Sequence, residues 1–471
     1  MPVLTGPTGP VPLTFEQERY LAKTRAGDWT TKNVRLSYEI LGPFDSELFT
    51  EAVRAFVARH DALRLRLTAD GGGAGAGERA QEVHPLGSDE PVVERQAVSA
   101  ASTEQFSRYA AALLSRDFVD PWDGERRPFA LRLLRRDAYH HAFLANFPNL
   151  VFDGRAHQLF AREIWRDYRA LLRGEPVPER APSFAAAALD QRSRTGPLLH
   201  ERARASWRDR LDQAVRSPWE RPSGAVATED GRCRAELSGP AVDALRAACE
   251  RERCTPLQRV VAAFVRALAE HAGQRRVALW TSMDSRLTRQ QDLVGMFAAS
   301  CPLVVRDPGA APEAVLGEVR GQFLEALRHQ RVTSADVAEL TGGAEAGAGR
   351  PYGRDIELNL RRFDGPSGRT AQDGALRITP DAYPLRRITF RSPAALQLRC
   401  DEHRDRIVLD LLYDGGRVGR PLARTVLDGL VHGLVHGLDH GPVNSPVRGP
   451  VNGAVHGPVR SPVRGHREPR P

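Results

Sequence analysis

Apolar residues recur along most of this chain either at every second position or at helical spacing, and these two patterns predict its elements. Over 33–42 the period is two, which indicates a half-buried strand. Asp45 then occupies the position of a helix cap, and helical spacing continues to Arg59. The expected buried face of this helix is Phe49, Ala52, Val53, Phe56 and Val57.

The segment 140–172 repeats the order strand then helix, with a polar turn between the two. The run "HHAFLANF" (140–147) predicts a buried strand, and helical spacing resumes over 155–172. The turn contains Pro148 and Asn149, neither of which takes up a proton at neutral pH. It ends in Asp153-Gly154, a pair that favours tight turns.

Strand and helix alternate again after residue 232, which predicts an α/β protein with two similar lobes. Helices are expected at 241–252, at 256–273 and from Pro421, and strands at 275–283, 301–306, 355–363, 396–402 and 406–414. Proline-containing stretches near 174–183 and 217–231 flank one bridging helix, whose Arg-rich part is 202–210. We therefore predict an N-terminal lobe over 13–180 and a C-terminal lobe over 181–435. Residues 1–12, rich in Pro and Gly, are expected to be flexible.

From about Gly433 the chain becomes a low-complexity repeat of Gly/Ser-Pro-Val-X, and we expect 436–471 to be a disordered tail. His432, His436 and His440 would align on a helix as a possible metal-binding face. The alternative is a repeat that happens to carry histidines, and on this interpretation no metal site is predicted. The glycine-rich run 71–77 lacks the Lys-Ser/Thr of a phosphate-binding loop and predicts a surface loop.

Charge and cysteine content narrow the functional classes. The 471 residues carry a net charge of +8, but the basic and acidic residues are interleaved, which argues against a nucleic-acid-binding surface. A mildly basic surface would suit an acidic protein partner. Five scattered cysteines without Cys-x-x-Cys spacing indicate reduced thiols in a cytoplasm. No apolar run is long enough to cross a membrane, and no signal peptide is recognisable.

Several segments, taken in order, resemble the motifs of the condensation domains of nonribosomal peptide synthetases. The resemblance covers roughly residues 11–435, and its order and spacing make it specific. The segments are "LTFEQERYLAK" (13–23), "RHDALRLRL" (59–67), "FPNLVFDG" (147–154), "FAAAALDQR" (184–192), "SWRDRLDQA" (206–214), "DLVGMFAASCPLVV" (292–305) and "HQRVTSADV" (329–337).

The resemblance implies two chloramphenicol-acetyltransferase-like lobes in a V with a tunnel between them. In this family, acyl or peptidyl carrier proteins present phosphopantetheine-tethered substrates from both ends of the tunnel, and no cofactor is bound by the domain itself. The amine of one substrate attacks the thioester of the other. No adenylation, carrier or thioesterase segment is recognisable, so the chain resembles a free-standing, monomeric member that works with other synthetase components. The implied setting is antibiotic or other secondary metabolism in a bacterium, with an actinobacterium favoured by the Arg-rich composition.

The chain departs from the family where catalysis is expected. Pro148 and Asn149 occupy the positions of the two motif histidines, whereas Asp153 and Gly154 are kept. The pair His140-His141 lies too far before Asp153 to be a shifted motif, and we expect buried or edge positions in the strand. In the later motif, Ala299 replaces the family's Asn and Ser300 its Thr. The resemblance implies a structural ion pair of Asp153 with an arginine, for which Arg286 is the best candidate.

The remaining site residues follow from the same resemblance, with alternatives left open. Gly154 could leave room for a pantetheine arm, or could be a turn glycine that needs a positive φ. His157, one helical turn after Asp153, could supply a surrogate base, or could be an exposed helix histidine. Arg155, Met296 and Ser300, together with Pro148, are expected to line the tunnel.

Two functions remain open at this point. The chain could be an amide-forming acyltransferase in which Asn149 positions the reactants, because Asn cannot act as a base near pH 7. Ester formation would suffer more from the loss of the histidine, since an alcohol needs deprotonation. Alternatively, the chain could be an inactive scaffold that recruits carrier proteins or tailoring enzymes. A variant of the first function would use a soluble coenzyme A thioester.

Overall fold

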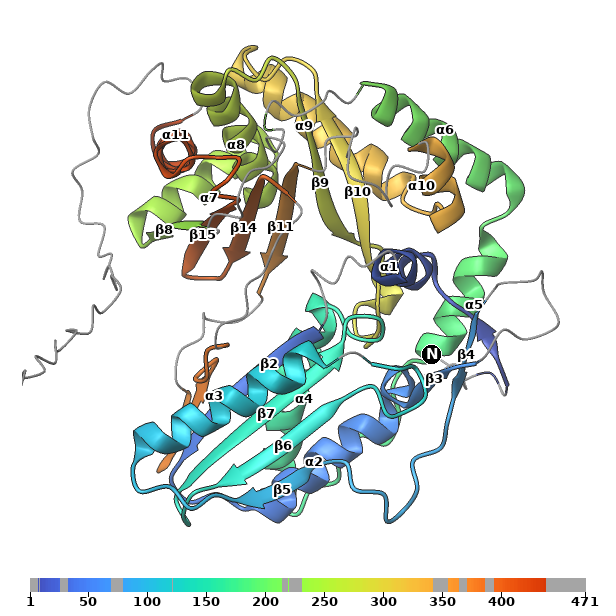
Figure 1. Ribbon diagram of the computed structural model, residues 1–471, viewed down its shortest axis with the longest axis vertical. Helices are drawn as coiled ribbons and strands as arrows, with labels where there is room; N and C mark the ends of the chain where they lie inside the picture. The colour runs from blue at the N-terminus through green and yellow to red at the C-terminus, as the bar shows by residue number, and fades with distance from the viewer. Residues whose placement is uncertain are drawn as a thin grey trace, which may run out of the picture.

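The computed structural model describes residues 7, 9–25, 33–68, 79–120, 122–213, 219, 231–341, 355–363, 371–385 and 394–437. Two six-stranded sheets with their helices form two lobes, one above the other in Figure 1. The predicted α/β class with two lobes is therefore confirmed. In the described part of the chain, no helix combines the length and the apolar character that a membrane span requires.

The N-terminal lobe is built on a sheet of order β12-β13-β2-β7-β6-β5. Its strands are β2 (Asn33–Leu41), β5 (Glu94–Ala97), β6 (Ala130–Arg135), β7 (His140–Pro148), β12 (Ala371–Asp373) and β13 (Leu376–Pro380). Neighbouring strands are antiparallel except β5 and β6. The helices α2 (Ser46–Arg59) and α4 (Gly154–Leu172) share a core with one face of this sheet. The other face packs against α3 (Thr103–Val119), which the hydrophobic pattern did not reveal.

The helix predicted after Asp45 is α2, and its details agree with the pattern. The Asp45 carboxylate accepts hydrogen bonds from the backbone N–H groups of Glu47 and Leu48, both at 3.0 Å. The five apolar residues predicted to be buried are all fully inaccessible to solvent. Burial of such a face is the main source of stability for a helix of this length.

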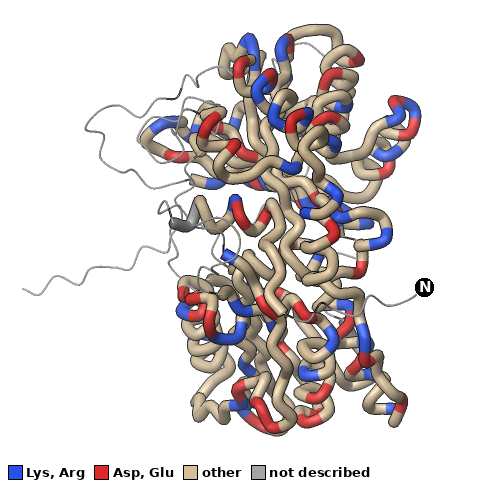
Figure 2. The backbone as a smooth tube through the Cα atoms, turned by 90° about the vertical axis from the view of Figure 1, so that its right-hand side faces the viewer, with Lys and Arg blue, Asp and Glu red and all other residues tan. Residues whose placement is uncertain are grey.

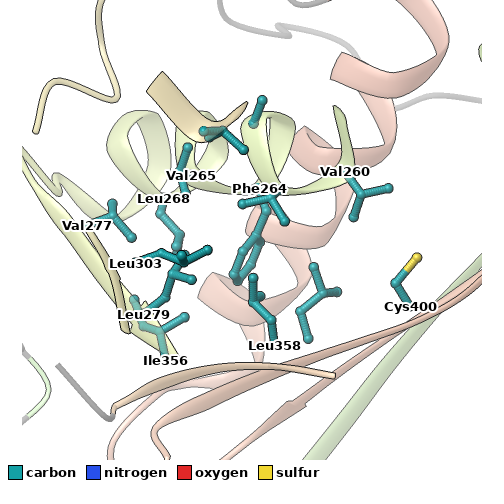
Figure 3. Packing of buried hydrophobic residues seen from close by; sticks show 14 of the residues in the cluster. Val260, Phe264, Val265, Leu268, Val277, Leu279, Leu303, Ile356, Leu358 and Cys400 are labelled. Atoms are coloured by element: carbon teal, nitrogen blue, oxygen red, sulfur yellow. The ribbon is translucent and has the colours of Figure 1, made fainter. Parts of the chain in front are cut away.

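The C-terminal lobe is built on a sheet of order β10-β9-β11-β14-β15-β8. Its strands are β8 (Gly231–Ser238), β9 (Val277–Asp284), β10 (Ala298–Val305), β11 (Ile356–Arg362), β14 (Leu396–Glu402) and β15 (Arg406–Tyr413). Four helices pack on one face: α7 (Pro240–Glu252), α8 (Pro256–Ala272), α9 (Pro312–Arg328) and α11 (Arg420–His436). Figure 3 shows Phe264 and Leu268 of α8 above Leu279 and Leu358 of the sheet.

The predicted lobe boundary at 180/181 is wrong in two respects. The hairpin β12–β13 comes from the C-terminal half of the chain but adds to the N-terminal sheet, where β13 pairs with β2. Leu293, Val294 and Phe297 also belong to the N-terminal core. A contiguous division cannot describe these exchanges, because each joins segments that lie far apart in the sequence.

The bridging region is two helices, α5 (Phe184–Arg194) and α6 (Pro197–Gln213), rather than the single helix predicted. Gly196-Pro197 interrupts the helical spacing, since Pro disfavours helical backbone in the residue before it. Phe184 of α5 packs in the N-terminal core and Trp207 of α6 in the C-terminal core. The change of lobe therefore lies between α5 and α6.

The two ends of the chain differ from the prediction in part. Val11–Pro12 form β1, which pairs with β4 (Ala80–Val83), and β3 (Leu65–Leu67) completes this small sheet. Val11 is 3% exposed, so the expectation of a flexible segment is wrong for this end of 1–12. The helix α1 (Phe15–Arg25) lies between the two lobes in Figure 1, and α10 (Ser334–Leu340) lies beside α6 and contacts α1. Residues 438–471, and with them most of the predicted tail, lie outside the described residues, as does the loop 71–77.

On α11, the imidazoles of His432 and His436 lie 4.7 Å apart between ring centroids, and His440 lies outside the described residues. Among the residues that the structure describes, no group of three His, Cys, Asp or Glu side chains could hold a metal ion. In Figure 2, acidic and basic residues are interspersed over both lobes in the coloured part of the chain, in agreement with the interleaving in the sequence.

Candidate active site

The turn between β7 and α4 is anchored by aromatic side chains on both sides of Asn149. Phe147 and Phe152 stack with 4.0 Å between their ring centroids, and both are fully buried in the N-terminal core. The N–H of Val151 donates to the Pro148 carbonyl at 3.1 Å and closes the turn. Asn149 is consequently fixed at the end of a buried strand while its own side chain remains half-buried. Among the described residues, none forms a hydrogen bond with the Asn149 amide.

Asp153 caps α4 and binds the C-terminal half of the chain through a buried network. Its carboxylate accepts from the N–H of Ala156 at 2.9 Å. The Arg286 guanidinium donates to both carboxylate oxygens, at 2.7 and 2.9 Å, and the N–H of Phe297 donates at 2.9 Å. The two charged side chains are 3% and 1% exposed. The ion pair expected between Asp153 and Arg286 is thus present.

The Arg286 side chain is itself enclosed by the segment that follows it. Its guanidinium donates to the carbonyls of Leu293 and Gly295 and lies 4.4 Å from the centre of the Phe297 ring. Every direction of the guanidinium therefore has a partner, as a buried charge requires. This network fixes the start of α4 against the segment 285–297.

Gly154 is the first residue of α4 and is exposed. Its φ is not in the left-handed region, so the alternative of a turn glycine needing a positive φ is wrong. A Cβ atom built on Gly154 would meet no atom within 4 Å. A small side chain at this position would therefore meet none of the described residues.

His157 lies one turn further along α4 and is half-buried, so the alternative of an exposed helix histidine is wrong. Burial is the largest cause that lowers the pKa of His157, to about 4. Arg361 and Arg35 lower this pKa further, whereas Asp381 and Asp401 raise it. These four residues come from β2, β11, β14 and the end of β13. His157 is accordingly an uncharged imidazole at pH 7, surrounded by charged groups of both lobes.

The family of the chain follows from comparison with known proteins. The model of the condensation domain matches residues 8–346. The chain belongs to the condensation-domain family. Phosphinothricin tripeptide synthetase PhsC of Streptomyces viridochromogenes is 31% identical over 339 residues, which are 68% of this chain and 30% of that protein. Chondramide synthase cmdD of Chondromyces crocatus is 26% identical over 328 residues, 66% of this chain and 8% of that protein. The chain thus spans well under two thirds of either relative.

Solved structures share the fold at lower identity. The condensation domain from the Monacolin K polyketide synthase MokA superposes with a TM-score of 0.70 at 18% identity, covering 92% of this chain and 99% of that one. The X-domain from teicoplanin biosynthesis, in its complex with OxyB, gives 0.68 at 21% identity, with 91% and 94% covered. These similarities show the fold alone.

Besides Pro148, three residues were expected to line a tunnel, and the structure places each of them in a different environment. Arg155 is half-buried and donates to the Gln291 carbonyl at 3.1 Å. Met296 is 5% exposed, next to Phe297 in the segment that Arg286 holds. Ser300 is half-buried in β10, and its carbonyl accepts from Arg19 of α1 at 3.2 Å. The Arg155 contact joins the first turn of α4 to the segment 285–297, whereas the Ser300 contact joins β10 to α1.

His140 and His141 lie in β7 and are both buried, as expected for strand histidines. His140 is 3.3 Å from Glu39, and the His141 ring packs 5.0 Å from that of Phe44. Burial lowers the pKa of His141 to about 4. Both rings are at the opposite end of β7 from Asn149, so neither replaces a motif histidine.

Three polar side chains near the turn were not predicted from the sequence. Arg35 and Asn146 are direct partners in the pairing of β2 with β7, and Asp381 follows β13. The single Asn within the apolar run "AFLANF" was a usable signal for Asn146. No sequence pattern pointed to Asp381, because its segment belongs to the C-terminal half of the chain but packs in the N-terminal lobe.

Proposed function

We propose that this condensation domain joins a carrier-bound acyl or aminoacyl thioester to an amine and forms an amide. The observation that carries the proposal is the arrangement at the start of α4. A fixed Asn149, the open space at Gly154 and the neutral imidazole of His157 lie along one turn and the first helical turn. The carriers would be acyl or peptidyl carrier proteins, and their phosphopantetheine arms would pass Gly154.

The reaction requires one bond to form and one to break. The amine nitrogen attacks the thioester carbonyl carbon, and the carbon–sulfur bond then breaks. The proton that the nitrogen loses ends on the leaving thiolate. In this proposal the Asn149 amide holds the amine or the carbonyl oxygen in place. Placement of two reactants can lower the barrier by about 7–11 kcal/mol.

His157 is the proposed proton acceptor. An uncharged imidazole can accept a proton through a ring nitrogen, whereas the side chains of Pro148 and Asn149 cannot. General-base catalysis typically contributes roughly 10²–10⁴-fold. Because its pKa is lowered to about 4, the His157 ring is a weaker base than free imidazole, and a proton that it accepts would move on to the thiolate rather than remain on the ring.

The specific observation in favour of the alternative, an inactive scaffold, is the replacement of both motif histidines by Pro148 and Asn149. Pro148 also removes a backbone donor at the end of β7. On this alternative, the domain would recruit carrier proteins or a tailoring enzyme without performing chemistry.

Deletion of the gene in its host, followed by complementation, separates the two functions. We expect wild type to restore the pathway product, and Asn149→Ala to restore at most about a tenth of it at equal protein level. Glu104→Ala, an exposed position on α3, is the matched control and should restore it fully. Equal amounts of product from the Asn149→Ala and wild-type strains would contradict the proposal. If the deletion strain still lacked the product in that case, the scaffold would be favoured.

A further inference from the structure

Two polar side chains with buried, unpaired atoms lie side by side on the N-terminal sheet. Asn146 is 3% exposed, and neither its side-chain nitrogen nor its side-chain oxygen has a hydrogen-bond partner among the described residues. Nη1 of Arg35 is also buried without a hydrogen bond in that part of the chain. The two residues are direct partners in the β2–β7 pairing, so their side chains stand next to each other on one face.

The two side chains do not bond to each other, and the Arg35 side chain is 30% exposed. The nearest acid to Arg35 is Asp381, whose carboxylate oxygen is 3.9 Å from Nη1 and whose side chain is 66% exposed. Arg361, across the lobe boundary, is already engaged with Asp401 at 2.6 Å. Burial lowers the pKa of Arg35, Asp381 raises it, and Arg361 lowers it further. An unpaired buried polar group is costly, and a third group that bonds to Asn146 and to Nη1 of Arg35 would remove this cost.

The position of the pair relates it to the candidate active site. Asn146 precedes Asn149 by three residues on β7 and its turn, which corresponds to roughly 10 Å of extended chain. A substrate whose reacting carbonyl lies at Asn149 can therefore extend along the sheet to Arg35 and Asn146. Both side chains offer N–H donors, and a guanidinium beside an amide suits an oxyanion.

We propose that Arg35 and Asn146 bind a carboxylate on one of the two substrates, several bonds away from the reacting carbon. This inference rests on the proposed function for its geometry and defines the substrate class of the same site. The carboxylate could belong to the acyl group or to the amine. In either case, a substrate with a plain alkyl end would leave both polar side chains unpaired.

Binding of matched probes to the full-length chain tests the inference. Suberoyl-pantetheine and octanoyl-pantetheine have the same chain length and differ in the terminal carboxylate; 8-aminooctanoate and octylamine form the corresponding amine pair. We expect the carboxylate member of at least one pair to bind wild type about tenfold or more tightly in isothermal titration calorimetry. Arg35→Met and Asn146→Leu should each reduce that ratio to about one.

Stability provides a readout that separates binding from structure. Because Asn146→Leu removes an unpaired buried polar group, its melting temperature should equal or exceed that of wild type. Ratios near one for both probe pairs in wild type, or unchanged ratios in both variants, would overturn the inference. A preference for the carboxylate without amide formation in the host would contradict the proposed function and leave the binding site standing.

Discussion

A single carboxylate, that of Asp153, connects three parts of the molecule: the start of α4, the Arg286 side chain and the Phe297 backbone. Both members of the charge pair are almost fully buried. A buried ion pair adds little stability compared with apolar side chains in place of both members. Loss of only one partner, however, leaves an isolated buried charge.

We therefore expect Arg286→Ala to destabilise the protein by about 3–5 kcal/mol. The melting temperature should fall by several degrees, measured by differential scanning calorimetry. Arg424→Ala is the matched control, since Arg424 and Asp428 form an exposed pair on α11 that contributes about 0–1 kcal/mol. Similar changes for both variants would show that the buried pair does not fix the turn.

His157 predicts a pH dependence of stability whose sign follows from its lowered pKa. The folded protein binds a proton at His157 only near pH 4, whereas the unfolded chain binds it near pH 6.5. As the pH falls between these values, the unfolded state takes up more protons, and stability is lost at up to about 1 kcal/mol per pH unit.

The variant His157→Gln removes this titration, so its melting temperature should fall less than that of wild type between pH 7 and pH 5. His141 has the same sign and a similar pKa, and it remains in both proteins as an internal reference. Parallel curves for the two proteins would mean that the pKa of His157 is the same in the folded and unfolded states, so that burial does not lower it.

At the scale of elements, the motif "RHDALRLRL" is explained by two buried polar networks. Arg59, at the end of α2, binds Glu163 and Asp167 of α4 at 2.8 and 2.6 Å. The Asp61 carboxylate accepts from the N–H groups of Phe184 and Ala185 and thereby caps α5. The motif thus positions the helix that begins at the candidate active site.

The hairpin β12–β13 approaches β2 at Gly42, where a side chain is excluded. Gly42 has a φ of +111°, and a Cβ there would overlap the Ala375 carbonyl. We expect Gly42→Ala to loosen the hairpin, seen as faster amide hydrogen exchange over β13 and a lower melting temperature.

Gly174→Ala is the matched control for this prediction. Gly174 also has a positive φ, +70°, but a Cβ there would meet nothing within 4 Å. Its cost should be limited to the backbone term of about 1–2 kcal/mol, with no change in β13. Equal effects of the two substitutions on β13 would contradict the close approach.

The elements with strong periodicity could be predicted from the sequence, and those set by distant contacts could not. The buried faces of α2 and α4 follow from helical spacing, and β7 from its continuous apolar run. The hairpin β12–β13 is short and gains its partners from the other lobe, so no local pattern marks it. The same reason applies to the site. Asp153 and Arg286 could be predicted from motifs, whereas the burial of His157 depends on residues from other elements.

At the scale of the whole molecule, α11 is the last element that the structure describes. Its apolar side is buried in the C-terminal core, where Leu430 and Leu434 are 0% and 2% exposed. We expect removal of 441–471 to leave the melting temperature unchanged. Removal from residue 426 onward should lower it strongly, because each buried aliphatic side chain contributes about 1.5–3 kcal/mol. A large drop from the shorter truncation would show that the C-terminal repeat stabilises the folded core.

The two lobes share strands, core residues and a buried ion pair, so the turn at Asn149 is held from both sides. In the proposed reaction, Asn149 places the reactants at this boundary and His157 accepts the proton. The proposal therefore requires an imidazole at the site, which can be supplied from either position.

The most direct test is the initial rate of product accumulation in the deletion strain complemented with His157→Phe and with Asn149→His/His157→Phe. We predict that the single variant loses at least about tenfold in rate and that the double variant recovers part of the loss, while His84→Phe, a surface control, matches wild type. A wild-type rate for His157→Phe would contradict the account, because the reaction would then need no imidazole beside Asn149.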